Sequence, residues 1–342
     1  MTEVYYRKYR PKAFSEVVGQ EAAVKILQNA ISKKRLAHAY LFAGPRGTGK
    51  TTVARILARE AGAFDEDIIE IDAASSRGID EARELREAVR SFPMRSPYKV
   101  YIIDEVHMLT KEAFNALLKT LEEPPAHAIF ILATTELEKV PDTVRSRTQV
   151  FEFGKIGMGD IVGELQKIAE AEKLDAEDDA LKLIAFFAEG SLRDAENLLF
   201  QIAGGGEAKI SEKNARLFLG APEEESVRGL LKNALGKNVA ETLAAYGEIL
   251  EDGVDPALLQ KLILRDLRAA YFLALDQKTE NMLLREFSKD EIDFLKELAK
   301  AGEQHLGFAF KSIMDAEKTF TDDYLKSIPL ELALIKMATY SK

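Results

Sequence analysis

The chain has 342 residues, of which 46% are hydrophobic and 30% charged, a composition typical of soluble proteins with two or three domains. It contains no cysteine and only four histidines, which excludes disulfides, thiolate zinc sites and a cysteine nucleophile and argues against a histidine-rich metal site. The net charge of −10 argues against a uniformly basic nucleic-acid-binding surface, although residues 1–60 carry twelve Lys/Arg and only four Asp/Glu.

The N-terminal segment, residues 1–10, has no apolar core after its charged residues, so it is not a secretory signal. No stretch of the chain reaches the roughly 18 uninterrupted apolar residues of a membrane-spanning helix. We therefore expect a cytoplasmic protein that has no membrane partner.

Short apolar runs alternate with segments of helical spacing between residues 38 and 153. The apolar runs cover residues 38–43, 67–71, 99–104 and 128–134, and a fifth, weaker run covers 150–153. The segments with helical spacing cover residues 51–61, 79–89 and 111–121. Strands that alternate with helices form βαβ units, so we predict a parallel sheet covered by helices on both faces.

A glycine-rich segment between the first run and the first helix fits the phosphate-binding pattern G-x-x-x-x-G-K-[ST]. Its residues are Gly44, Pro45, Arg46, Gly47, Thr48, Gly49, Lys50 and Thr51, and Thr52 follows them in the predicted site. Glycines allow backbone N–H groups to point at phosphate oxygens, and the positive end of the following helix faces the same anion. We predict that Lys50 reaches the β- and γ-phosphates and that the Thr51 hydroxyl ligates Mg²⁺. A chance glycine-rich turn is disfavoured, because a strand precedes the pattern and a helix follows it.

The apolar run 99–104 ends in two carboxylates, Asp104 and Glu105. In parallel sheets ligands bind at the carboxyl ends of the strands. We expect Asp104 to hold the water shell of Mg²⁺, and Glu105 to orient and polarise an attacking water. An Asp-Glu pair by itself is usually part of a polar loop, but together with the phosphate loop it predicts ATP hydrolysis.

The pattern changes near residue 158, where three amphipathic segments with no strand between them begin. These segments cover residues 162–171, 178–188 and 192–203. Beyond Pro222 the chain reads as helical to its end. We predict an α/β domain at 1–157, a helical segment at 158–221 and an all-α domain at 222–342.

Several stretches together resemble the AAA+ clamp loaders, and most closely the gamma/tau family of bacterial DNA polymerase III. They include Tyr9-Arg10-Pro11-Lys12, Val18-Gly19-Gln20, the phosphate loop, and the segments 38–42, 70–75, 104–109, 114–125, 133–135, 146–147 and 190–195. The resemblance is dense from residue 4 to about 203 and most specific in 104–125. It implies an AAA+ P-loop ATPase domain with a three-helix lid, followed by a helical collar that joins subunits.

The resemblance also implies roles for individual residues. Four of them would border an adenine pocket: Arg10, Pro11, Val17 and Val18. Thr135 would be the sensor residue at the end of its strand, near the γ-phosphate. Arg193 would be a second sensor that contacts the phosphates from the lid.

Arg147, within Ser146-Arg147-Thr148, corresponds to the arginine finger of the family, which acts in trans on ATP held by a neighbouring subunit. A cation supplied in trans couples hydrolysis to assembly. The alternative for Arg147, and also for Arg193, is a surface arginine in a helix cap or a salt bridge.

The implied function is an ATP-hydrolysing subunit that loads the polymerase III beta clamp onto primed DNA. Its expected partners are the delta, delta-prime and further gamma subunits, the sliding clamp, and primer–template DNA bound without sequence preference. The candidate DNA contacts are Ser75, Ser76, Arg77 and Arg83. The alternative for this segment is an N-cap at Ser76 followed by an amphipathic surface helix.

Two departures from the family concern zinc. The family usually has a four-cysteine zinc module after the phosphate-loop helix, but here residues 59–67 connect directly to the next strand, and Thr148 occupies the position of another family cysteine. We therefore expect ATP and Mg²⁺ but no zinc. Two alternative functions are a catalytically silent, delta-prime-like scaffold, which tends to lose the phosphate loop, and another AAA+ DNA-remodelling motor.

Overall fold

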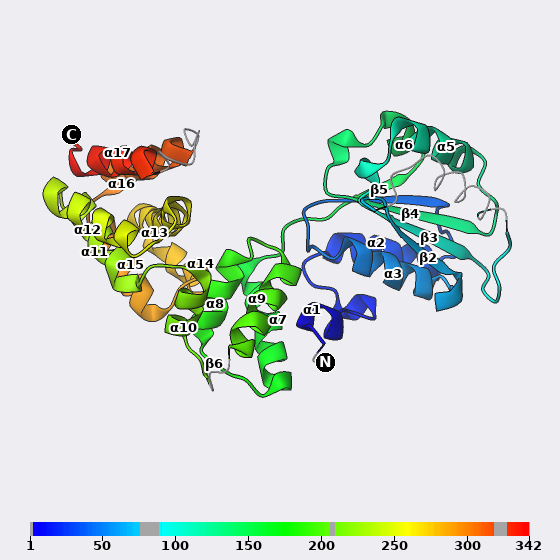
Figure 1. Cartoon of the computed structure of the whole chain (residues 1–342), viewed down its shortest axis with the longest axis horizontal. Helices are drawn as coiled ribbons and strands as arrows, with labels where there is room; N and C mark the ends of the chain where they lie inside the picture. The colour runs from blue at the N-terminus through cyan, green and yellow to red at the C-terminus, as the bar shows by residue number, and fades with distance from the viewer. Residues whose placement is uncertain (1–2, 76–88, 90, 206–208, 318–326, 342) are drawn as a thin grey trace. The chain divides into compact units, whose positions relative to one another are not determined.

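The computed structural model describes residues 3–75, 89, 91–205, 209–317 and 327–341 (Figure 1). The chain divides into two compact units. The first comprises Met1–Ile168 and Ala185–Phe200, and the second comprises Ala169–Ile184 and Gln201–Lys342. The predicted helix 79–89 lies outside the described residues except for its last position, Val89.

The first unit contains a five-stranded sheet in which every neighbouring pair is parallel. Its strands, in spatial order, are β2 (Ile68–Asp72), β3 (Lys99–Asp104), β4 (Ala128–Thr134), β1 (Ala39–Ala43) and β5 (Gln149–Glu152). All five lie within one residue of the predicted apolar runs, so the predicted parallel α/β sheet is confirmed. Because β4 separates β1 from β3, the residue that follows β4 lies between the ends of those two strands.

Helices cover both faces of this sheet (Figure 1). One layer contains α2 (Glu21–Ser32) and α3 (Lys50–Glu60), and the other contains α5 (Lys111–Glu122) and α6 (Asp142–Arg145). Side chains of β1 alternate between the layers, since Tyr40 and Phe42 pack with α2 and α3 while Leu41 packs with α5. This double burial explains why the strands read as continuous apolar runs.

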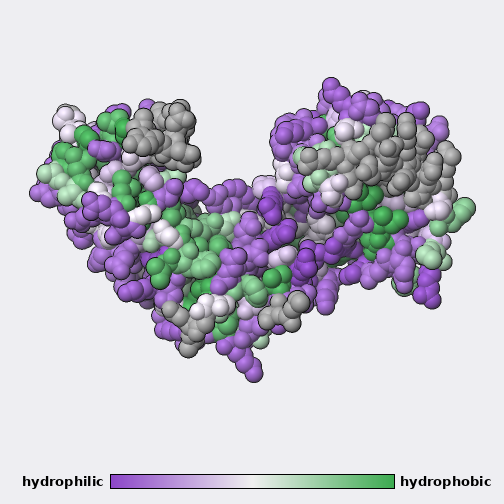
Figure 2. All heavy atoms as spheres, in the orientation of Figure 1, coloured by the Kyte–Doolittle hydropathy of each residue, from purple (hydrophilic) through white to green (hydrophobic). Residues whose placement is uncertain are grey.

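The remaining helices of the first unit are short or continue into the second unit. They are α1 (Tyr5–Lys8), α7 (Met158–Glu172), α8 (Asp178–Phe187) and α9 (Leu192–Gly204). The last three match the three predicted amphipathic segments. Figure 2 shows mainly hydrophilic side chains on the face in view, as expected when apolar side chains are used in the interior.

The second unit is built around α13, which packs against α11, α15, α16 and α17. The helices of this unit beyond α9 are α10 (Glu212–Leu219), α11 (Glu224–Leu235), α12 (Val239–Glu251), α13 (Pro256–Leu275), α14 (Glu280–Leu283), α15 (Lys289–Ala299), α16 (Glu303–Glu317) and α17 (Ser327–Ala338). The side chain of Asp255 begins α13 by accepting hydrogen bonds from the N–H groups of Ala257 and Leu258. Fully buried leucines and isoleucines, among them Leu230, Ile263 and Leu306, fill the core of this helical bundle.

The expectation that no strand separates the three lid helices is wrong. Two short strands, β6 (Asp175–Ala176) and β7 (Lys209–Ile210), pair in parallel, and β6 lies between α7 and α8. An ion pair of 2.7 Å between Lys209 and Glu177 supports the same junction. Strands of two residues are too short to show the alternating pattern by which a strand is recognised in a sequence.

None of the helices that the structure describes has both the length and the apolar character needed to cross a membrane.

Asp67 stabilises the connection that leads into β3. Its buried carboxylate accepts backbone hydrogen bonds from Met94 at 2.6 Å and from Arg95 and Ser96 at 3.0 Å each. Burial opposes ionisation of this group, but the hydrogen bonds outweigh it and lower the pKa of Asp67 to about 2.

We expect Asp67→Asn to lower the melting temperature of the first unit by several degrees at pH 7, because one amide nitrogen would then face backbone N–H groups. A lowered pKa contributes stability that is present above pH 3.8 and is lost as the pH falls through about 2. Thermal unfolding at pH 7 and at decreasing pH measures both effects. Equal melting temperatures of the two proteins at pH 7 would contradict this account.

Candidate functional site

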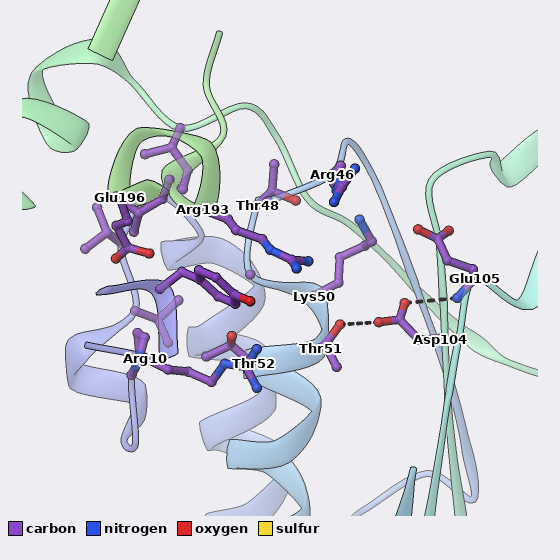
Figure 3. A pocket seen from close by; sticks show the side chains of 18 residues that line it. Arg10, Arg46, Thr48, Lys50, Thr51, Thr52, Asp104, Glu105, Arg193 and Glu196 are labelled. Atoms are coloured by element: carbon purple, nitrogen blue, oxygen red, sulfur yellow. Dashed lines mark hydrogen bonds between the residues drawn. The ribbon is translucent and has the colours of Figure 1, made fainter. Parts of the chain in front are cut away.

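A pocket of the first unit lies where the carboxyl ends of β1 and β3 meet the start of α9 (Figure 3). Its cavity volume is about 150 Å³, and it is open to solvent. The lining residues are Tyr6, Arg10, Pro11, Val17, Val18, Arg46, Gly47, Thr48, Gly49, Lys50, Thr51, Thr52, Asp104, Glu105, Ile156, Leu192, Arg193 and Glu196. The pocket thus combines residues 46–52 of the predicted phosphate site, the predicted adenine border, the two carboxylates and one predicted sensor arginine, whereas Gly44, Pro45 and Thr135 are not among its lining residues.

The glycines of the phosphate loop are required by close approaches of the chain. A Cβ atom at Gly47 would lie 1.9 Å from Ser191 Oγ, just before α9, and one at Gly44 would lie 2.2 Å from the carbonyl oxygen of Phe153. Gly49 precedes α3 with a φ of +95°, a left-handed conformation that glycine adopts without strain. The loop is therefore tightly held between β1, the start of α9 and the chain that follows β5.

Lys50 is the first residue of α3, and its ammonium group bends back into the loop. Nζ donates hydrogen bonds to the carbonyl oxygens of Gly44 and Pro45, both at 2.7 Å. Burial lowers the pKa of Lys50, and the carboxylates of Glu105 and Asp104 oppose this effect. An anion bound in the loop would therefore replace these neutral carbonyl groups as the partner of the Lys50 ammonium group.

Thr51 and the carboxylates at the end of β3 form a connected polar group, marked by dashed lines in Figure 3. Thr51 Oγ1 donates to Asp104 Oδ2 at 2.7 Å, and the N–H of Glu105 donates to Asp104 Oδ1 at 2.9 Å. Glu105 has a φ of +49°, a left-handed conformation that is uncommon for a residue with a side chain and is concentrated at functional sites.

The residues around Asp104 suit magnesium. A threonine hydroxyl and a carboxylate are hard oxygen ligands, and Mg²⁺ is usually held by one or two such groups together with waters and phosphate oxygens. Thr51 and Asp104 are already in contact, so one cation would reach both oxygens once the threonine hydroxyl turns its proton away. We regard these two residues as the candidate metal ligands.

Thr135 follows β4 and contacts the second carboxylate. Its hydroxyl donates to Glu105 Oε2 at 3.1 Å. His107 approaches the same carboxylate oxygen, with Nδ1 3.0 Å from Thr134 Oγ1 and 3.5 Å from Glu105 Oε2. The neighbouring strand therefore helps to orient the Glu105 carboxylate, and His107 is a contact that the sequence did not predict.

Part of the pocket lining is apolar. Pro11, Val17 and Val18, the predicted apolar border of an adenine pocket, belong to it together with Ile156 and Leu192. The buried Gln20 connects the phosphate loop to the chain that follows β5. Its amide nitrogen donates hydrogen bonds to the carbonyl oxygens of Thr48 and Gly154.

Four lining residues were not predicted: Tyr6, Ile156, Leu192 and Glu196. Helical spacing could have identified two of them, because Leu192 and Glu196 are one turn apart on the helix that carries Arg193. Tyr6 and Ile156 carry no comparable signal in the sequence.

Arg193 extends from the start of α9 toward Lys50 (Figure 3). Its guanidinium carbon lies 4.7 Å from the centroid of the Tyr6 ring, which is close enough for a cation–π contact. The side chain therefore lies on the Lys50 side of the pocket, and its sensor role stays a prediction.

Arg147 lies outside this pocket. It lines a separate, open depression together with His38 and Glu122, and it forms an ion pair of 2.7 Å with Glu122. Within this chain it therefore makes a surface salt bridge, as the alternative interpretation states. A role in trans needs a neighbouring subunit and stays a prediction.

One of the candidate DNA contacts, Ser75, lies in the turn after β2, where its hydroxyl donates to the carbonyl oxygen of Asp72 at 3.0 Å. The other three candidates, Ser76, Arg77 and Arg83, lie outside the described residues. The predicted DNA contact therefore stays a prediction.

Two family models match the chain. One is described as the delta subunit of DNA polymerase III and matches residues 19–70 and 61–157. The other is described as the ATPase lid domain of a DNA polymerase III clamp loader subunit and matches residues 160–207. The matched residues include the whole pocket except its N-terminal border.

Curated relatives match over more of the chain. The DNA polymerase III subunit gamma of Buchnera aphidicola subsp. Schizaphis graminum is 32% identical over 362 residues, covering 99% of each protein. The subunit tau of Bacillus subtilis is 47% identical over 278 residues, and this match covers 75% of the chain but only 49% of that protein. The chain therefore spans about half the length of this longer relative.

Solved structures of the Thermotoga maritima RuvB Holliday junction branch migration motor have a similar fold. One of them superposes with a TM-score of 0.52 at 23% sequence identity and covers 66% of the chain and 78% of the RuvB chain. At this level of identity the likeness concerns the AAA+ fold alone.

Proposed function

The chain belongs to the gamma/tau family of DNA polymerase III clamp-loader subunits, and on this premise we propose that it is an ATP-hydrolysing motor that loads a sliding clamp onto primed DNA. The observation that carries this proposal is the single pocket in which Lys50, Thr51 and Asp104–Glu105 meet. A catalytically silent scaffold has no need for this complete set. The pocket therefore favours the motor function.

The proposed mechanism uses residues that are already in position. Thr51 and Asp104 are the residues that would hold Mg²⁺, which would supply positive charge at the phosphate oxygens. Lys50 and Arg193 bind the phosphate oxygens from two sides of the pocket. Glu105 orients the attacking water and accepts its proton, and the Thr135 hydroxyl fixes the direction of the Glu105 carboxylate.

The proposed division of the chain follows the family. Residues 1–157 form the ATPase domain, 158–221 the lid and 222–342 the collar through which subunits assemble. Arg147 of one subunit completes the site of its neighbour, and the segment with Ser75, Ser76, Arg77 and Arg83 contacts the DNA backbone. The partners are other clamp-loader subunits, the clamp and primer–template DNA.

The test is ATP turnover by the complex assembled with its partner subunits. We expect primed DNA and the clamp, added together, to raise the rate of phosphate release above the rate with either one alone. The complex without DNA and clamp is the reference. No stimulation by DNA plus clamp would contradict the clamp-loader function, even if the chain hydrolyses ATP.

A further inference from the structure

Arg193 is an exposed side chain that lines the pocket without an ion-pair partner. Its stem lies close to the phosphate loop, since a Cβ atom at Gly47 would lie 3.4 Å from Arg193 Cβ. Within the described ranges of the chain, no carboxylate forms an ion pair with its guanidinium group. An arginine side chain without such a partner has many rotamers, and fixing one of them when a ligand binds costs conformational entropy. Any contact that holds Arg193 in place beforehand reduces this cost.

Tyr6 supplies such a contact. The guanidinium carbon of Arg193 lies 4.7 Å from the centroid of the Tyr6 ring, and both side chains line the pocket. The face of an aromatic ring carries partial negative charge, so it attracts the cation without neutralising it. A carboxylate in the same place would form an ion pair that a phosphate group would have to displace. The ring therefore restrains the guanidinium group and leaves its full positive charge available to an anion.

The short helix α1 fixes the position of Tyr6. Its first residue, Tyr5, is buried, and the Tyr5 ring packs edge-on against Phe200 of α9 with a centroid distance of 5.0 Å. Phe200 follows Arg193 by about two helical turns, so both side chains lie on the same face of α9. Two adjacent tyrosines of α1 thus contact two points on one face of α9, which sets the Tyr6 ring beside Arg193.

We infer that Tyr6 is a positioning residue for ATP binding, an inference that rests on the proposed function: its ring holds Arg193 on the Lys50 side of the pocket before the phosphates arrive. The contact reduces the conformational entropy that Arg193 loses on binding, and the affinity for ATP increases accordingly. Tyr6 acts through Arg193 and takes no part in the hydrolysis chemistry. Its effect on the affinity for ATP therefore depends on the presence of Arg193.

The experiment is a double-mutant cycle on the full chain. Titration calorimetry with ATP and Mg²⁺ measures the affinities of the wild type, Tyr6→Leu, Arg193→Ala and the variant with both changes. We expect Tyr6→Leu to weaken ATP binding about two- to fivefold, the range of a cation–π contact at an exposed site. In the Arg193→Ala background the same change has no further effect, because the ring then has no arginine of the pocket to position. Tyr6→Phe keeps the affinity within about twofold of the wild type, since phenylalanine retains the aromatic face.

A fluorescence measurement tests the contact without nucleotide. The chain contains no tryptophan, so Tyr6→Trp introduces a single tryptophan at the contact. Tryptophan retains the cation–π contact, and we expect its emission spectrum to change when Arg193→Ala is added. This result would show that the aromatic ring and Arg193 are already in contact in the free protein.

The control variant is Lys8→Ala. It removes another cation–π contact of α1, between Lys8 and the Tyr9 ring at 5.4 Å, and neither residue lines the pocket. This variant should bind ATP with the affinity of the wild type. Thermal unfolding without nucleotide checks that each variant is folded.

Equal effects of Tyr6→Leu with and without Arg193 would overturn the inference, because Tyr6 would then contact the nucleotide directly or only stabilise the fold. An unchanged or increased affinity for ATP in Tyr6→Leu would also overturn it and leave the proposed function intact. Emission of Tyr6→Trp that does not respond to Arg193→Ala would contradict the contact itself. Failure of the wild type to bind ATP would overturn the proposed function.

Discussion

Replacement of Lys50 by alanine is expected to abolish ATP binding at micromolar concentrations. The Lys50 ammonium now donates to the carbonyl oxygens of Gly44 and Pro45, and in the complex it would exchange these neutral acceptors for charged phosphate oxygens. Each hydrogen bond to a charged group contributes about 1.5–3 kcal/mol, so losing two weakens binding at least about a hundredfold. Titration calorimetry with ATP and Mg²⁺ measures this loss.

The matched control is Lys25→Ala, which removes an exposed lysine of α2 that does not line the pocket. This variant should bind ATP with the affinity of the wild type. The melting temperature of Lys50→Ala without nucleotide shows whether the loop still folds. Wild-type affinity in Lys50→Ala would show that the pocket does not bind the phosphates of ATP through this loop.

Arg147→Ala is expected to bind ATP normally but to lose hydrolysis in the assembled complex. Arg147 does not line the pocket of its own chain and makes an exposed ion pair with Glu122, so its removal leaves that pocket unchanged. An arginine supplied in trans raises kcat by roughly 10³–10⁵ in related hydrolyses, so we expect a loss of at least about a hundredfold. ATP turnover of the complex, stimulated by DNA and clamp, is the measurement.

Arg145→Ala provides the control for this prediction. Arg145 is two residues away, is similarly exposed and forms an ion pair of 3.1 Å with Asp142. A surface ion pair contributes little to stability, so this variant should hydrolyse ATP at the wild-type rate. If Arg147→Ala and Arg145→Ala have equal rates in the complex, Arg147 is only a surface arginine.

Local patterns predicted much of the fold. The strands of the sheet were identified because burial on both faces requires continuous apolar residues, as in β1 and β4. The start of α3 was identified because Gly49-Lys50-Thr51 has a fixed spacing relative to the strand before it. By contrast, the pair β6 and β7 was missed, since each strand has two residues and depends on a partner more than thirty residues away.

The same distinction applies to the candidate site. The phosphate loop and Asp104–Glu105 are contiguous motifs, and their chemistry can be read from residue type and spacing. Tyr6, Glu196 and His107 were not assigned to the site, because each contributes through contacts with residues that are distant in the chain. The prediction for Arg147 differs again, since its proposed partner is another subunit.

The sequence by itself determined that this chain is an α/β protein with a phosphate-binding loop and paired carboxylates, because those features depend on local spacing and on apolar periodicity. Only the tertiary structure decided which of them meet. The strand order places β4 between β1 and β3, so that the Thr135 hydroxyl contacts Glu105 across strands. It also buries Glu196 in the wall of the pocket, and this burial raises the pKa of Glu196 to about 7. Burial and pairing between distant segments depend on packing, which no short stretch of sequence contains.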